Sequence, residues 1–163
     1  MSLPRWLLRA LAGTLLAGWF GSWTLFALVI APTAFQVLPS QAAAGTLVGP
    51  VLRALHNYGI FAGIALALLG GLLQRGRLAI VVPVVLTALC AVSEYLVTPA
   101  IADLQPRSFG VDLEQEAAER FSDLHQISRY LFGIVQFATL GLIVLYARPD
   151  SDGQAGSKPQ SGT

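Results

Sequence analysis

Charge is scarce in this 163-residue chain and is missing altogether from long stretches of it. Only 12% of the residues are charged, whereas 55% are hydrophobic; soluble domains carry about 25% charged residues. No Asp, Glu, Lys or Arg lies between Arg9 and Arg53, and none lies between Arg129 and Arg148. A helix needs about 20 apolar residues to cross the hydrocarbon core of a membrane. These blocks therefore argue against an ordinary soluble domain and predict contact with a lipid bilayer.

Cysteine and catalytic motifs are also nearly absent. Cys90 is the single cysteine, which excludes an intramolecular disulfide and a cysteine-based metal cluster. The sequence contains no glycine-rich phosphate loop and no nucleophile elbow, so it gives no support for an enzyme of soluble type. The net charge of +1 gives no reason to expect nucleic acid as a partner.

The apolar blocks predict an all-α, integral membrane four-helix bundle. Helices are expected because lipid offers backbone groups no hydrogen-bond partners. The chain should form one four-span transmembrane domain over residues 1–148, with a disordered cytoplasmic tail over residues 149–163 that is rich in Ser, Gly and Gln. Pro32 and Pro99 are expected to end the first and third helices. The predicted spans cover residues 7–31, 51–73, 78–97 and 124–146.

Two helices are expected to begin well before their apolar blocks. Ser40 is a candidate N-cap for an early start of the second helix, with Pro50 as a kink. Asp112 and Gln115 have the spacing of a capping box, which predicts that the fourth helix starts near residue 113. The loop before the fourth helix would then cover residues 106–111.

The basic residues indicate the orientation of the bundle. If there are four spans, the basic residues next to the two ends of the bundle domain and in the turn between the second and third spans fall on one side of the membrane. The positive-inside rule makes that side cytoplasmic, so both termini are expected in the cytoplasm. We expect a multi-pass protein of the plasma membrane, in particular a bacterial inner membrane, because Arg outnumbers Lys as in GC-rich genomes. The residues that set this orientation are Arg5, Arg9, Arg75, Arg77, Arg148 and Lys158.

Similar short motifs recur in the two halves of the chain. Ala31-Pro32 corresponds to Thr98-Pro99, and Leu55-His56 corresponds to Leu124-His125, with offsets of 67–69 residues. The pattern predicts two repeated hairpins related by an axis normal to the membrane; chance similarity between apolar helices is the alternative.

Small residues recur every four positions in the first two spans, which lets helix backbones approach closely. Packing within the bundle is the preferred interpretation, and a dimer interface is the alternative. Four spans are few for an autonomous transporter, so a homo-oligomer or a larger membrane complex is expected. The small residues are Gly13, Ala17 and Gly21, followed by Gly59, Gly63, Ala67 and Gly71.

Glu94 is the most informative single residue, because it lies inside the third apolar block. A carboxylate facing lipid is unfavourable by several kcal/mol at mid-membrane, so Glu94 should face the bundle. Its candidate partners are Arg53, Arg129, His56 and His125. Glu94 would form a structural ion pair or hydrogen bond, belong to a proton relay or ligand site, or simply lie at the membrane interface.

The two histidines raise a second hypothesis. His56 and His125 lie at matching places in the two halves, and imidazoles on separate helices are ligands for zinc, copper or haem. The alternative is that they bind backbone, carboxylate or headgroup. Ser128 shares a helix face with His125 and, together with Glu94, would line a small polar cavity. The sequence does not identify a cofactor.

A stretch at the start of the fourth span, Phe121-Ser122-Asp123-Leu124-His125-Gln126-Ile127-Ser128, has the form Phe-x-x-x-His-x-x-Ser. Together with the Ala31-Pro32 and Thr98-Pro99 helix ends, it resembles the transmembrane protein 205-like family, four-span membrane proteins classed as a domain of unknown function. The resemblance covers the chain up to about Tyr146 and implies a four-helix membrane fold. A mammalian relative is associated with resistance to a platinum drug, which points to metal or small-molecule handling. His56 has no known counterpart in the family, which favours His125.

Three functions follow as hypotheses. The first is a transport or resistance accessory protein with a small polar pocket near the outer face, formed by Glu94, His125, Arg129, Ser128 and Arg53. The second is a haem- or metal-binding membrane redox module with His125 and His56 as candidate ligands. The third is a structural or assembly protein without a ligand, whose polar residues only fix helix packing.

Overall fold

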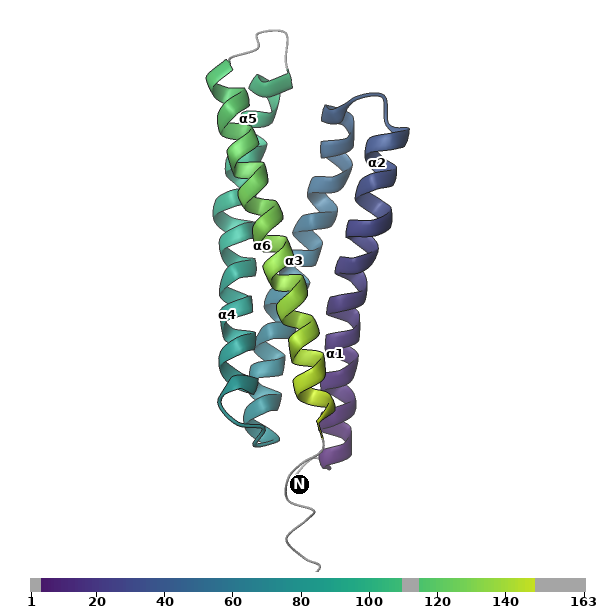
Figure 1. Cartoon of the computed structure of the whole chain (residues 1–163), viewed down its shortest axis with the longest axis vertical. Helices are drawn as coiled ribbons and strands as arrows, with labels where there is room; N and C mark the ends of the chain where they lie inside the picture. The colour runs from purple at the N-terminus through teal and green to yellow at the C-terminus, as the bar shows by residue number, and fades with distance from the viewer. Residues whose placement is uncertain (1–3, 110–114, 149–163) are drawn as a thin grey trace, which may run out of the picture.

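The computed structural model describes residues 4–109 and 115–148, and this part of the chain is built from helices without a strand. Two π-helices, η1 and η2, interrupt the first and third rods without ending them, so four continuous rods result (Figure 1). All four are long and apolar enough to cross a membrane, the architecture of a multi-pass membrane protein. The elements are α1 (Arg5–Leu25), η1 (Phe26–Ile30), α2 (Ala31–Val37), α3 (Gln41–Leu72), α4 (Leu78–Val92), η2 (Ser93–Val97), α5 (Thr98–Phe109) and α6 (Gln115–Ala147).

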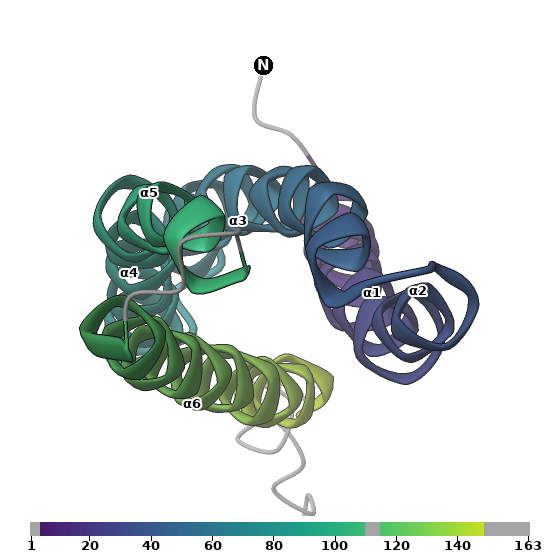
Figure 2. The ribbon, with the colours of Figure 1, turned by 90° about the horizontal axis from the view of Figure 1, so that it is seen from above.

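The four rods form a closed ring in which each helix packs on the next and the last packs on the first. α3 packs against α1 and α4, and α6 packs against α4 and α1 (Figure 2). The rods alternate in direction, so α1 begins and α6 ends at the same end of the bundle (Figure 1). We call this the terminal end, and the other the distal end.

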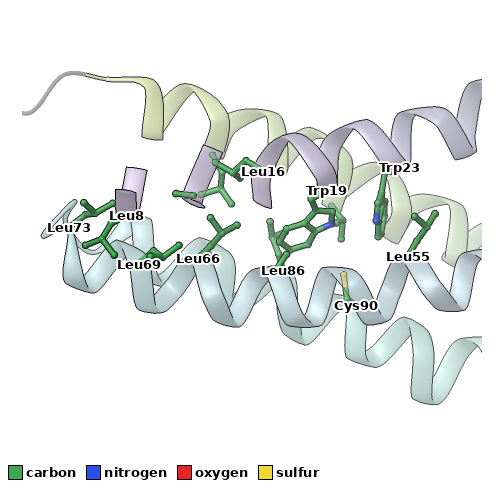
Figure 3. Packing of buried hydrophobic residues seen from close by; sticks show 14 of the residues in the cluster. Leu8, Leu16, Trp19, Trp23, Leu55, Leu66, Leu69, Leu73, Leu86 and Cys90 are labelled. Carbon is green, nitrogen blue, oxygen red and sulfur yellow. The ribbon is translucent and has the colours of Figure 1, made fainter. Parts of the chain in front are cut away.

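The core is a column of large apolar side chains inside the ring. α1 contributes one residue per turn to this column, which is the helical period expected of a buried stripe (Figure 3). The outward faces are apolar as well, with Phe137 76% and Leu28 72% exposed. Such surfaces suit contact with lipid chains. The principal core residues are Leu8, Leu16, Trp19, Trp23, Leu55, Leu66, Leu69, Leu86, Cys90, Val135 and Leu142.

The prediction that Pro32 and Pro99 end their helices is wrong. Proline lacks an N–H group, and its ring crowds the carbonyl four residues earlier. In both rods a π-helical turn ends two residues before the proline, and the residue between them donates a hydrogen bond that reaches five residues back. The N–H of Ala31 donates to the carbonyl of Phe26, and the N–H of Thr98 donates to that of Ser93. The wider turn lets the helix continue past the proline.

Predictions about the distal end have mixed outcomes. Ser40 is the N-cap of α3, as expected, and its Oγ accepts a hydrogen bond of 3.1 Å from the N–H of Ala43. The predicted loop over residues 106–111 is wrong in its first part, because α5 packs along α6 and stays helical through Phe109. Asp112, the start of a helix near residue 113, and the tail over residues 149–163 lie outside the described residues.

Glycine packing is confirmed between α3 and α4, with one change of position. A Cβ on Gly63 would meet Thr87 and the carbonyl of Pro83, and one on Gly70 would meet the carbonyl of Ala79. Gly71, predicted for this face, has only an ordinary contact at 3.9 Å. In α1, a Cβ on Gly13 or on Gly21 would meet no atom of the described residues within 4 Å, so close packing in this part of the chain does not depend on these two glycines.

A basic turn fastens the terminal end. The α3–α4 turn uses positive φ angles at Gln74 (55°) and Gly76 (85°). Arg75 in this turn donates from Nη1 to the carbonyls of Tyr146 (3.0 Å) and Arg148 (2.6 Å). Because the carbonyl end of a helix carries partial negative charge, the guanidinium suits this position and ties the turn to the end of α6.

Candidate functional site

Glu94 lies in π-helix η2 and its side chain is only 5% exposed. The π-helical turn of η2 presents Glu94 to α3 rather than to lipid. Its Oε1 accepts from Nε of Arg53 at 2.9 Å, and its Oε2 lies 3.4 Å from Nδ1 of His56. Of the four candidate partners, the structure thus brings Arg53 and His56 to Glu94.

The two partners differ strongly in exposure. His56 is buried, whereas the Arg53 side chain is 61% exposed. They lie three residues apart on one face of α3, which is the spacing that lets both reach a single carboxyl group. The carboxyl group of Glu94 therefore contacts one buried partner, His56, and one exposed partner, Arg53. We call these three residues the Glu94 cluster.

Aromatic rings cover the inner side of the Glu94 cluster. The ring of Trp23 meets His56 edge-on, with centroids 5.8 Å apart, and stacks on Phe132 at 4.4 Å. Phe132 in turn contacts Phe26 of η1 at 5.7 Å. The rings link the first, second and fourth rods at one level and exclude water from one side of the imidazole, which strengthens its interaction with the carboxyl group.

A cavity of about 330 Å³ opens between the rods on the distal side of the Glu94 cluster. It lies where the α2–α3 and α5–α6 pairs diverge (Figure 1). Pockets that bind small molecules begin at about 300 Å³ and are mostly apolar with a few polar groups, as this one is. The lining residues are Phe35 of α2, Gln41, Gly45, Val48, Gly49 and Leu52 of α3, Thr98, Ile101 and Ala102 of α5, and Phe121, His125 and Ser128 of α6.

The residues predicted for the site fall into two adjoining groups. His125 and Ser128 line the cavity, and the imidazole of His125 stacks parallel to the ring of Phe121 at 5.9 Å. Arg129 follows Ser128 on α6 and is exposed. The Glu94 cluster connects to the cavity through the chain, because Leu52 precedes Arg53 and Thr98 lies one turn after Glu94.

Sequence reasoning missed the α3 wall of the cavity. Gly45 and Gly49 have the four-residue spacing of close helix packing, yet they line the cavity. One signal for this wall was available in the sequence. The part of α3 before the predicted span, residues 41–50, carries no charged residue although it lies outside the apolar block. Sequence reasoning also missed that Gln136 Nε2 donates to Thr24 Oγ1 at 2.6 Å, which places this polar pair between α6 and α1 and not in the cavity.

Metal or haem ligation by histidine remains a prediction. His56 is paired with Glu94, while His125 stacks on Phe121. Among the described residues, no group of three or more His, Cys, Asp or Glu side chains could hold a metal ion. An absorption spectrum with elemental analysis of the purified protein and its His125→Ala variant would test the hypothesis directly.

The chain was compared with known proteins at three levels. No family model, curated protein or solved structure matches it. The cavity and the Glu94 cluster therefore provide the functional argument.

Proposed function

We propose that this protein is a transport or resistance accessory protein that binds a small molecule in the cavity at its distal end. The observation that carries the proposal is the cavity itself, about 330 Å³ in volume, with the side chains of His125 and Ser128 in an otherwise mostly apolar lining. This combination suits an amphipathic ligand that buries its apolar part and accepts or donates hydrogen bonds at His125 and Ser128.

The Glu94 cluster supports the same site. A structural ion pair alone does not require a neighbouring cavity, whereas this cluster adjoins the cavity through Leu52 and Thr98. The proposal gives Arg53 and Glu94 the task of holding the α3 and α5 walls in register, and gives Arg129 a place at the rim. A purely structural protein is the competing function.

The membrane orientation is part of the proposal. Arg9, Arg75 and Arg148 lie at or near the terminal end, so the positive-inside rule supports cytoplasmic termini and a distal cavity on the outer face, in a bacterial inner membrane. Fusion of a green fluorescent protein to the C-terminus should give fluorescent cells, while a C-terminal alkaline phosphatase fusion should be inactive. Dark cells with the fluorescent fusion and an active phosphatase fusion would show that the C-terminus lies outside the cytoplasm, which contradicts the proposed orientation.

The two halves of the chain support a repeat of two hairpins. η1 begins at Phe26 and η2 at Ser93, and each ends two residues before its proline, so the elements are offset by the same 67 residues as Pro32 and Pro99. Membership of the transmembrane protein 205-like family is proposed on the residues given above. A homo-oligomer is a further part of the proposal, and Gly13 and Gly21, which are open on the surface of α1, are its candidate contacts.

Loss of the two polar side chains that α6 contributes to the cavity is expected to abolish function without loss of protein. In a bacterial strain lacking the gene, the parent protein should raise tolerance to amphipathic toxic compounds in a growth panel, and the His125→Ala/Ser128→Ala double variant should return tolerance to the empty-vector level. Immunoblots of the membrane fraction should show equal amounts of both proteins.

Gln126→Ala is the matched control for this experiment. Gln126 adjoins His125 on the same turn of α6, is exposed, and is not among the cavity-lining residues. It should retain full tolerance. If the double variant behaves like Gln126→Ala for every compound that the parent protects against, the cavity is not the working site.

A further inference from the structure

Each π-helix is followed directly by a segment that lines the cavity. η1 is followed by α2, which supplies Phe35 to one wall, and η2 is followed by α5, which supplies Thr98, Ile101 and Ala102 to another. The two segments that follow the π-helices therefore hold parts of different walls of the same cavity. π-helical turns within α-helices occur frequently at functional sites.

Each π-helix is also a place where the backbone ladder is weakened. Pro32 and Pro99 cannot donate the hydrogen bond that an α-helix would place there, and the last N–H before each proline makes a five-residue bond. Sharp changes of helix direction concentrate at such sites. The α2–α3 and α5–α6 pairs diverge beyond this level (Figures 1 and 2).

The Glu94 cluster restrains one of these two sites. Glu94 belongs to η2 itself, and its bonds to Arg53 and His56 tie η2 to α3 below the cavity. At η1 the corresponding contact is aromatic, between Phe26 and Phe132. A bridge with one exposed partner can break and reform, because the Arg53 side chain is 61% exposed and is not held in place by packing inside the bundle.

We propose that η1 and η2 are a matched pair of hinges on which α2 and α5 move, and that the bridge from Glu94 to Arg53 and His56 holds the α5 side closed against α3. Breaking the bridge widens the cavity. Glu94 is in this proposal a positioning residue, which acts on the width of the cavity and does not itself touch the ligand.

The width of the cavity can be measured without any ligand, so the result does not depend on the proposed function. In a Cys90→Ala background, nitroxide labels at Val37→Cys on α2 and Asp103→Cys on α5 span the distal end, and both positions are exposed. Double electron–electron resonance in lipid nanodiscs then gives their distance distribution. The control pair is Leu11→Cys with Val144→Cys, exposed on α1 and α6 away from the hinges.

Glu94→Gln and Arg53→Gln should each lengthen the mean distance between the labels at positions 37 and 103, the distal pair, by about 2 Å or more, which is the scale of known helix shifts. Each should also broaden the distance distribution of this pair. The Pro32→Ala/Pro99→Ala variant should narrow the distribution, because it restores both backbone donors. The distance distribution of the control pair should stay unchanged in all variants.

Unchanged distances of the distal pair in both bridge variants would overturn the proposal. Equal broadening of the two pairs would overturn it too, because it indicates general loosening of the bundle. Arg53→Gln keeps the test valid if Glu94→Gln fails to fold, because Arg53 is largely exposed.

Discussion

Glu94→Ala is expected to lower the free energy of unfolding by about 3 kcal/mol, the lower end of the range for a broken buried ion pair. The substitution leaves the buried His56 without its carboxyl partner and removes the 2.9 Å contact to Arg53. We expect a loss at the lower end because the Arg53 side chain is 61% exposed and is not left buried without its partner. Reversible unfolding in mixed micelles, followed by the fluorescence of buried Trp19 and Trp23, would measure the change.

The matched control is the pair of Glu116 and Arg120 on α6. Its Nη2–Oε1 distance is 2.8 Å, but both side chains are exposed, at 77% and 69%. Surface pairs of this kind contribute about 0–1 kcal/mol, so Glu116→Ala should change stability little. Loss of stability in a Glu94→Ala/His56→Ala double variant should be smaller than the sum of the single losses. Additive losses would show that the two groups do not act together.

Gly70→Ala is expected to destabilise the bundle by about 1–3 kcal/mol, the usual range for an overpacked interior. A Cβ at this position would run into the backbone carbonyl of Ala79 on α4 and lie 3.0 Å from the hydroxyl of Tyr146. The backbone cannot move aside as a side chain can, and the same hydroxyl donates to the carbonyl of Leu66. The unfolding assay used for Glu94 would measure this loss too.

Gly71→Ala separates this packing effect from helix propensity. Gly71 is the next residue of α3, and its added Cβ would make only an ordinary contact with Ile80 at 3.9 Å. Alanine in a helix interior is favoured over glycine by about 0.5–1 kcal/mol, so this variant should be neutral or more stable. Equal effects of the two substitutions would argue that close approach of α3 to α4 does not limit stability.

The spans could be predicted because they depend on local composition. Stretches without charge set the number of helices, and Ser40 supplies a cap that any helix start would use. These features need no knowledge of neighbouring helices. The continuation through Pro32 and Pro99 could not be predicted, because proline ordinarily disrupts a helix interior and the π-helical turn that accommodates it leaves no marker in composition.

The site was predicted in part for a similar reason. Glu94 stands out because a carboxyl group is unfavourable in an apolar block. That argument identifies Glu94 as a residue that faces the bundle, but it does not choose among the candidate partners. The choice of Arg53 and His56 depends on the rotation of α3 against η2, which arises from packing. The α3 wall of the cavity was missed because Gly45 and Gly49 look like contact residues until the divergence of the rods is known.

The closed ring has a consequence for the order of assembly during synthesis. α1 leaves the ribosome before α6, yet two of its residues have partners on α6. Trp23 stacks on Phe132, and Thr24 accepts a hydrogen bond from Gln136. Contacts so distant in sequence form late, since a long chain segment must be closed before they are gained. The nascent chain therefore carries an incompletely covered first helix until the last one inserts, and a message truncated before α6 would yield three helices with an open seam, a substrate for membrane quality control.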